Sequence, residues 1–131
     1  MRVSGKQDLN EKALTERILG FAINVHRSLG PGLLESVYEE CLCHELAIAP
    51  VPFTRQQPIP VVYGSVKLEC GFRADIVVDR RVLIEIKSID RFAPIHEAQV
   101  LTYLRLSKLK VGLLLSFNSV RMIDGMKRLV L

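Results

Sequence analysis

The sequence predicts an α/β fold in which a mixed β-sheet is flanked by helices. Two stretches near the N-terminus repeat apolar residues every three or four positions, and a group of short apolar or alternating runs follows. One further stretch of helical spacing interrupts those runs, which is the pattern of helices packed on a mixed sheet. An apolar fraction of 49% with only 24% charged residues supports a packed core and excludes a disordered chain.

The two N-terminal helices are predicted at about residues 9–28 and from Pro31 to about residue 47. Asp8 with Glu11 resembles a capping box for the first helix. Gly30 suits the C-terminal cap of this helix, and Pro31 suits the first turn of the next.

Four strand-like runs follow, then a helix and two more strands. The first two runs predict a hairpin around the Gly64-Ser65 turn, and the helix is expected at about Pro94–Ser107. A continuous apolar run after this helix is typical of a fully buried strand. The expected strands are Ile59–Tyr63, Val66–Cys70, Phe72–Val78, Val82–Lys87, Lys110–Phe117 and, after a turn at Asp124-Gly125, Lys127–Leu131.

Length and composition limit the functional classes. The 131 residues suit one domain spanning 1–131, and no apolar run reaches the roughly 20 residues that span a bilayer. The N-terminal residues lack the apolar core of a signal peptide, so we expect no membrane partner and a cytoplasmic location. Cys41, Cys43 and Cys70 form an odd set that we expect to be buried or half-buried thiols. The net charge of +4 is compatible with a polyanionic partner but does not demonstrate one.

The segment RADIVVDRRVLIEIKS places its charges on one face if it forms a hairpin. The even-numbered positions Ile76, Val78, Val82, Ile84 and Ile86 are apolar, whereas the odd ones include Arg73, Asp75, Asp79, Glu85 and Lys87. One face is therefore expected to form core and the other to carry charge. If the even residues of both strands share the core face, opposed residues have numbers with an even sum and the loop holds an odd number of residues. A three-residue loop at Asp79–Arg81 meets this condition and sets Asp75 opposite Glu85.

Two carboxylates brought together repel each other, and a shared proton or a hard cation such as Mg²⁺ or Mn²⁺ resolves the repulsion. A metal would allow water to ionise near neutral pH and would neutralise charge growing on a phosphate. Lys87 is placed to hold the attacking water or to contact the phosphate. These components suit phosphodiester hydrolysis. The alternative is that a Glu-x-Lys pair on an exposed strand is merely solvated, and the short motif alone favours that alternative.

The spacing of Asp75 and the Glu85-Ile86-Lys87 motif, after an acid-bearing helix and before a helix and a buried strand, resembles the PD-(D/E)xK nuclease superfamily. The chain more closely resembles the small GxxExxY family of that superfamily, through GLLESVY at residues 32–38 and through LGPGLLESVYEECL, ADIVV, IEIKS, AQVLTYL and GLLLSFN. The resemblance implies a restriction-endonuclease-like αβββαβ core, DNA as the substrate, and products that carry a 5′-phosphate. The proline of the superfamily motif is absent, because Ala74 precedes Asp75.

The resemblance also implies residue roles. Glu35, on the first core helix, is expected to join Asp75 and Glu85 as a ligand of Mg²⁺ or Mn²⁺; the alternative is a carboxylate that only interacts with the helix dipole. The RecB-like branch adds a Gln-x-x-x-Tyr motif, matched by Gln99 and Tyr103, which share one helical face.

Four further residues are candidate accessory residues. His26 lies where some members of that branch carry a metal-binding histidine, although a histidine near a helix C-terminus is also a partner for the helix dipole. Tyr38 belongs to the GxxExxY segment, and Arg73 shares the charged face of the hairpin. Tyr103 is equally consistent with a core aromatic residue that has a solvated hydroxyl.

The first hypothesis is therefore a Mg²⁺- or Mn²⁺-dependent nuclease acting on DNA. In this hypothesis Asp75, Glu85 and Glu35 bind metal, Lys87 positions the attacking water, and Gln99 supports the site. The alternative is a nuclease-fold module that binds nucleic acid or protein without turnover, and a third reading is a regulatory protein that uses the fold for dimerisation. The intact set of two acids and a lysine favours the first. A homodimer is left open.

Overall fold

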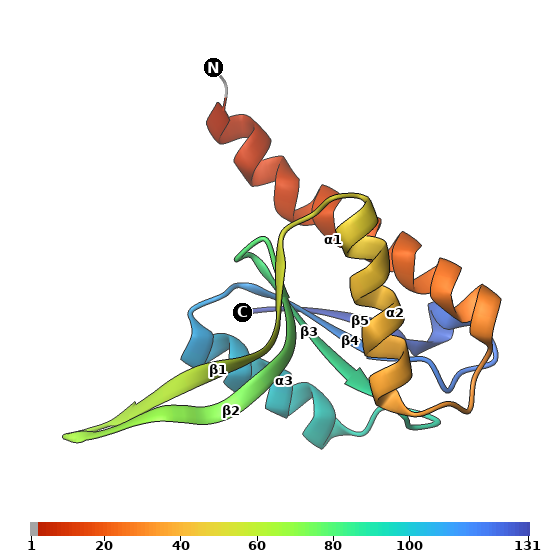
Figure 1. The fold of residues 1–131 in the computed structure, drawn as a ribbon. Helices are drawn as coiled ribbons and strands as arrows, with labels where there is room; N and C mark the ends of the chain where they lie inside the picture. Colours follow the sequence, from red (N-terminus) through yellow and green to blue (C-terminus); the bar gives the residue numbers. More distant parts are fainter. Residues whose placement is uncertain (1–2) are drawn as a thin grey trace.

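The computed structural model describes residues 3–131, with side chains from residue 11 onward. Five strands form one sheet in the order β1-β2-β3-β4-β5, with α1 and α2 on one face and α3 on the other (Figure 1). The predicted mixed sheet flanked by helices is confirmed, and the order α2-β1-β2-β3-α3-β4 is the αβββαβ order that the resemblance implies. The elements are α1 (Val3–Leu29), α2 (Glu35–Ile48), β1 (Phe53–Tyr63), β2 (Val66–Val78), β3 (Val82–Lys87), α3 (Pro94–Ser107), β4 (Val111–Ser116), a 3-10 helix η1 (Met122–Gly125) and β5 (Met126–Val130).

The sheet contains one parallel pair. β3 and β4 run parallel and are joined through α3, whereas the other neighbouring strands are antiparallel. Lys87 lies beside Ser116 in this register, so both strands end at the same edge of the sheet. The Ser116 hydroxyl donates a hydrogen bond to the carbonyl of Ile89 (2.6 Å) and accepts one from its N–H (3.2 Å). This contact fixes the chain where it leaves β3.

The predicted strands Val66–Cys70 and Phe72–Val78 are wrong as separate elements, because β2 runs without interruption through both. Its pairing with β1 shifts register between Ile59 and Val61, and the irregularity includes Gly71, where an added side chain would collide with Val61. The glycine therefore marks an irregularity within one strand and not a break between two strands. β1 also begins earlier than predicted, at Phe53.

The outer half of the β1–β2 hairpin projects from the rest of the molecule (Figure 1). Its tip carries exposed apolar side chains, including Val62 and Tyr63, of which Tyr63 is 80% exposed. Among the described residues, the core under α3 reaches Ile59 on β1 and Phe72 on β2, and neither core extends further toward the tip.

The helix starts differ from the predictions. α1 begins at Val3, so Asp8 and Glu11 lie inside it and the predicted capping box is wrong. α2 begins at Glu35, and Pro31 lies in the loop before it, where the left-handed φ of +97° at Gly32 keeps the chain out of a helix. No helix in the described part of the chain is both long and apolar enough to cross a bilayer.

The loop between α1 and α2 is closed by specific hydrogen bonds. Gly30 has a φ of +74°, and its N–H donates to the carbonyl of His26 (2.8 Å), which confirms the predicted C-terminal cap. The Tyr38 hydroxyl donates to the Gly30 carbonyl (2.6 Å) and accepts from the Leu33 N–H (3.0 Å). Its ring stacks on Phe117, with centroids 4.5 Å apart.

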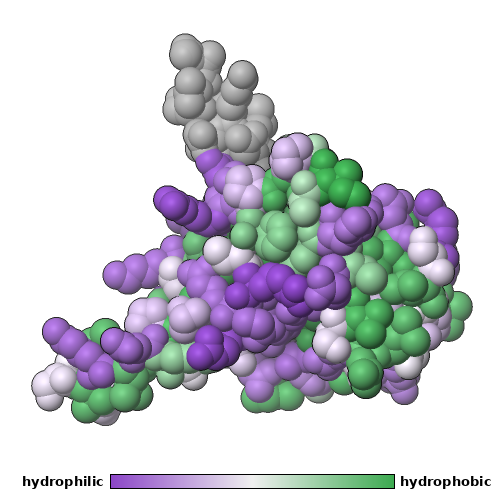
Figure 2. All heavy atoms as spheres, in the orientation of Figure 1, coloured by the Kyte–Doolittle hydropathy of each residue, from purple (hydrophilic) through white to green (hydrophobic). Residues whose placement is uncertain are grey.

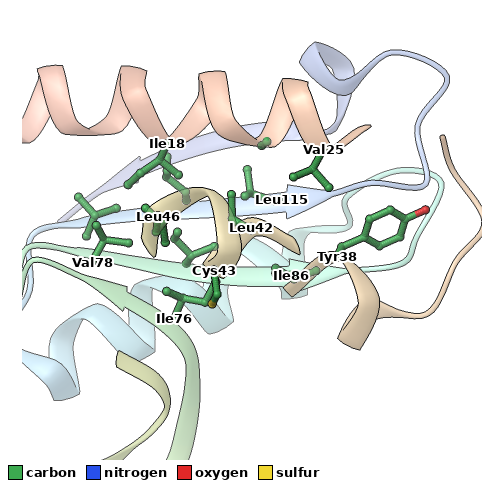
Figure 3. Packing of buried hydrophobic residues seen from close by; sticks show 14 of the residues in the cluster. Ile18, Val25, Tyr38, Leu42, Cys43, Leu46, Ile76, Val78, Ile86 and Leu115 are labelled. Atoms are coloured by element: carbon green, nitrogen blue, oxygen red, sulfur yellow. The ribbon is translucent and has the colours of Figure 1, made fainter. Parts of the chain in front are cut away.

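Both faces of the sheet are packed. The core under α1 and α2 includes the even-numbered residues that were predicted for it, Ile76, Val78, Val82, Ile84 and Ile86 (Figure 3). The opposite face was expected to carry charge rather than core. It also forms core, because Val77 and Leu83 are buried there under α3. Asp75 and Glu85 lie two positions beyond these residues along their strands.

The three cysteines are free thiols. Cys43 is buried and Cys41 half-buried, as predicted, but Cys70 is exposed on the projecting hairpin, which corrects the prediction for that residue. Burial raises the pKa of the Cys43 thiol to about 12, so this thiol is chemically inert at neutral pH.

Candidate functional site

Asp75 on β2 and Glu85 on β3 approach each other at the end of the hairpin ladder. Ile76 pairs with Ile84, and the strands are joined by a turn at residues 79–81. This is the register that the alternating pattern predicts, with an even sum for each pair and an odd loop. Extending it by one residue sets Asp75 opposite Glu85, and the two charges interact strongly enough to affect the pKa of Glu85.

The Asp75 carboxylate is held by two donors from the neighbouring strands. Its Oδ2 accepts a hydrogen bond from the backbone N–H of Ile86 on β3 (2.8 Å). Its Oδ1 accepts one from the side-chain Nε2 of Gln56 on β1 (3.3 Å). The Asp75 side chain thus bonds to β3 beyond the last backbone pair of β2 and β3. Hydrogen bonds from β3 and from β1 together fix the orientation of its carboxylate.

Glu85 is a buried carboxylate, only 9% exposed. Its Oε2 lies 3.8 Å from the Nζ of Lys87, and its buried Oε1 has no hydrogen-bond partner among the described residues. Burial, and next the charge of Asp75, raise the pKa of Glu85 to about 8, against the lowering effect of Lys87; Glu35 adds a smaller upward effect. The site therefore concentrates more negative charge than the lysine compensates.

α3 brings Gln99 and Tyr103 to the same side of the sheet. Gln99 Oε1 is the other buried side-chain oxygen of the described residues that has no partner. The Tyr103 ring stacks on Phe72 of β2 at 3.8 Å. Burial, and then the charges of Glu85 and Asp75, raise the pKa of Tyr103, so its hydroxyl lies within electrostatic range of both acids.

Glu35 is the first residue of α2 and is exposed. The negative charge of Glu35 contributes to the raised pKa of Glu85, so α2 places a third carboxylate near Asp75 and Glu85. Within the described residues, however, no three or more His, Cys, Asp or Glu side chains form a group arranged to hold a metal ion. The structure therefore brings Asp75 and Glu85 together and leaves Glu35 at their periphery.

The remaining candidate residues have other contacts. His26 is buried near the end of α1 and donates from Nε2 to the carbonyl of Ser119 (2.7 Å). Both hydrogen bonds of the Tyr38 hydroxyl go to the α1–α2 loop. Arg73 is exposed, and its Nη1 donates to the backbone carbonyl of Gln56 (3.3 Å).

Three residues linked to Asp75 by hydrogen bonds, directly or through one another, were not predicted from the sequence: Gln56, Glu39 and Arg55. Glu39 is buried on α2 and accepts hydrogen bonds from both of the others. Figure 2 shows a hydrophilic area on the front face, between α2 and the β1–β2 pair, which are the elements that carry these residues. Glu39 follows Glu35 by four residues and so shares its helical face, which was an available signal. Nothing in the local sequence marks Gln56.

The donor set fits a hard divalent cation. Mg²⁺ prefers oxygen ligands and in proteins often uses only one or two carboxylates together with waters and substrate phosphates. Asp75 and Glu85 supply two carboxylates, one of which has a buried oxygen without a partner.

A cavity of about 590 Å³ elsewhere in the molecule is lined by residues such as Thr54, Asp79 and Ser107, and it includes none of the predicted site residues.

A protein-family model matches the chain from residue 12 to residue 129, well over half of its length. Its description is the PD-(D/E)XK nuclease superfamily. The chain has no match among curated proteins and none among solved structures. The narrower likeness to the GxxExxY family and the RecB-like branch stays a prediction. The family match and the observed order of helices and strands lead to the same conclusion: the chain belongs to the PD-(D/E)XK nuclease superfamily.

Proposed function

We propose that this protein is a metal-dependent nuclease that hydrolyses phosphodiester bonds of DNA. Members of the superfamily are generally nucleases and typically use divalent metal ions. The observation that carries the proposal is the pair of Asp75 and Glu85, with a buried oxygen of Glu85 lacking a partner and the Lys87 ammonium 3.8 Å from the other oxygen.

Asp75 and Glu85 would hold Mg²⁺ or Mn²⁺, with Glu35 as a third ligand. When bound, such an ion supplies positive charge that lowers the pKa of water and neutralises charge developing on the phosphate. The side chains that neighbour the pair have separate tasks, which follow from their chemistry.

Lys87 would orient the attacking water and contact a phosphate oxygen. Its ammonium is a compact point charge with three donors, and it lies on the same strand and face as Glu85. Gln99 would complete the positioning of the water or the phosphate, because its buried Oε1 is an acceptor without a partner and its amide also carries two donors. Positioning of this kind supplies a large part of the rate enhancement in phosphoryl chemistry.

The test is cleavage of single-stranded, duplex and branched DNA, and of matched RNA, in the presence of Mg²⁺ or Mn²⁺. Asp75→Asn, Glu85→Gln and Lys87→Ala should each lower the cleavage rate by about 100-fold or more, because each removes a group that acts on the water or the phosphate. EDTA should abolish cleavage by the unchanged protein.

Matched controls come from the projecting hairpin. Glu69→Gln and Lys67→Ala make the same chemical changes at exposed positions of β2 and should leave the rate unchanged. Binding of these substrates without metal-dependent cleavage of any of them would sink the proposal and favour a binding module. Cleavage that survives both Asp75→Asn and Lys87→Ala would point to another site or to a contaminant.

A further inference from the structure

Gln56 lies on β1 directly beside Asp75, in a backbone conformation that is unusual for its residue type. We propose that Gln56 is a positioning residue that fixes the Asp75 carboxylate for cation binding, and that Glu39 and Arg55 hold Gln56 in place. This proposal rests on the proposed function, because it concerns the same metal site.

The side-chain amide of Gln56 bridges two carboxylates from different elements. Its Nε2 donates to Asp75 Oδ1 on β2 (3.3 Å) and to Glu39 Oε1 on α2 (2.9 Å). A primary amide nitrogen has two hydrogens, and an ionised carboxylate only accepts, so one nitrogen satisfies both acids at once. The amide therefore keeps two negatively charged groups in place without adding a charge of its own.

Glu39 is itself anchored. Its Oε2 accepts hydrogen bonds from Arg55 Nε (3.2 Å) and Nη2 (3.0 Å), and the same guanidinium donates from Nη1 to Glu40 (3.0 Å). Charge-assisted hydrogen bonds to a fork of donors are strong and directional. Glu39 is consequently a fixed acceptor for the Gln56 amide, in addition to Asp75.

The result is a carboxylate with both oxygens oriented. Oδ2 of Asp75 is fixed by the Ile86 N–H of β3, and Oδ1 is fixed by Gln56 of β1. A carboxylate offers about four lone-pair sites, so the sites that remain are free for a cation next to Glu85. Groups that orient a metal ligand in this way affect metal affinity or activity by about 10- to 100-fold when they are removed.

The backbone of Gln56 supports a role for its side chain. Its φ is +50°, in the left-handed region that disfavours residues other than glycine. The paired positions Arg55 with Ile76 and Gln57 with Ala74 flank it, so the irregularity is confined to the residue that faces Asp75. Strain of this kind persists at functional sites when a side chain is needed there.

Gln56→Gly is the decisive variant, because it relieves the backbone and removes the amide. The purified full chain, free of metal, is titrated with MnCl₂ in a calorimeter, and its thermal unfolding is measured separately. Gln56→Gly should bind Mn²⁺ about 10- to 100-fold more weakly, while its metal-free melting temperature is unchanged or higher. Cleavage by this variant should recover toward the normal kcat as Mn²⁺ is raised.

Lys108→Gly is the matched control. Lys108 also has a left-handed φ, +64°, but it caps the C-terminus of α3. This substitution should give the same direction of change in melting temperature and leave Mn²⁺ affinity as it was. Gln56→Asn, which tolerates the backbone but is one methylene shorter, should weaken Mn²⁺ binding as the glycine variant does.

Three outcomes would overturn the proposal. Equal Mn²⁺ affinity of the unchanged protein and Gln56→Gly would remove its basis. A fall in the metal-free melting temperature parallel to the loss of Mn²⁺ binding would show that Gln56 only supports the fold. Absence of Mn²⁺ binding by the unchanged protein would overturn the proposed function, and the role of Gln56 with it.

Discussion

The environment of Glu85 disfavours its charged form. Glu85 is buried, faces the charge of Asp75 from β2, and receives further negative charge from Glu35 on α2, while Lys87 offers partial compensation and Tyr103 faces it from α3. A buried carboxylate with an unpaired oxygen lowers the stability of a protein, which agrees with the role proposed for Glu85 in metal binding.

This environment predicts a specific pH dependence of stability. The pKa of Glu85 rises from 4.5 to about 8 on folding, so the folded protein keeps a proton that the unfolded chain releases. The contribution of Glu85 is therefore most favourable below the unfolded pKa and is lost as pH rises toward 8. Glu85→Gln should remove this loss, and its gain over the unchanged protein should grow with pH to the order of a few kcal/mol.

The measurement is urea unfolding of both proteins in EDTA, from about pH 5 to about pH 9. The two stability curves should diverge through this range. Parallel curves would mean that Glu85 ionises normally in the folded protein. Glu69→Gln, on the exposed part of β2, serves as the control whose curve should follow that of the unchanged protein.

Residue types explain why part of the site was predictable. Asp75, Glu85 and Lys87 are odd-numbered, and the alternation of side chains along a strand therefore places them on one face of the β2–β3 hairpin. Gln99 and Tyr103 are four residues apart and therefore share one face of α3. Gln56 offers no such signal, because it lies on another strand, 19 residues before Asp75, and glutamine does not indicate a left-handed backbone.

At the scale of secondary-structure elements, the position of α3 depends on one glycine of β4. A Cβ at Gly112 would lie 2.7 Å from Cγ1 of Val100 on α3, so the helix rests directly on the strand backbone. α3 also carries Gln99 and Tyr103. The packing of Val100 on Gly112 therefore sets the distance of these two residues from the sheet.

Gly112→Ala should therefore destabilise the protein by about 1–3 kcal/mol through overpacking and lower the cleavage rate. Gly20→Ala makes the same substitution in α1, at a position with nothing within 4 Å of the added Cβ. It should stabilise the protein by about 0.5–1 kcal/mol, because alanine is the better helix residue. Urea unfolding of the two variants compares them directly, and equal signs would contradict the packing argument.

The elements themselves were predictable where a local signal was strong. α3 spans Pro94–Ser107 as expected, because a proline at its first turn and regular apolar spacing mark it. The first half of β1 was missed, since Pro58 argues against a strand; a proline is tolerated there because β1 lies at the edge of the sheet. The division of β2 failed for a related reason, because its pairing with β1 is a long-range property.

At the scale of the whole molecule, the site draws on elements from both faces of the sheet. α2 supplies Glu35 and Glu39, α3 supplies Gln99, and the strands between them supply the rest. Only the complete fold assembles this set, which is why a single hairpin motif was weak evidence. The same arrangement leaves no stacked aromatic platform at the site other than the pair of Phe72 and Tyr103 within the described residues.

Binding of DNA should accordingly depend on phosphate contacts. With a net charge of +4 and no tryptophan, the protein should lose affinity for DNA by about tenfold or more between roughly 50 and 200 mM salt. Fluorescence anisotropy in EDTA, which prevents cleavage, measures this dependence. An affinity that is insensitive to salt would show that other contacts dominate.

The projecting β1–β2 hairpin has a practical consequence. Its Gly64-Ser65 turn lies at the far end of two strands that leave both cores well before it, and Gly64 has a left-handed φ of +58° in an open surrounding. Loop tips of this kind accept inserted sequence with little effect on the fold. A fluorophore or an immobilisation tag could therefore be attached at this turn without contacting Asp75 or Glu85.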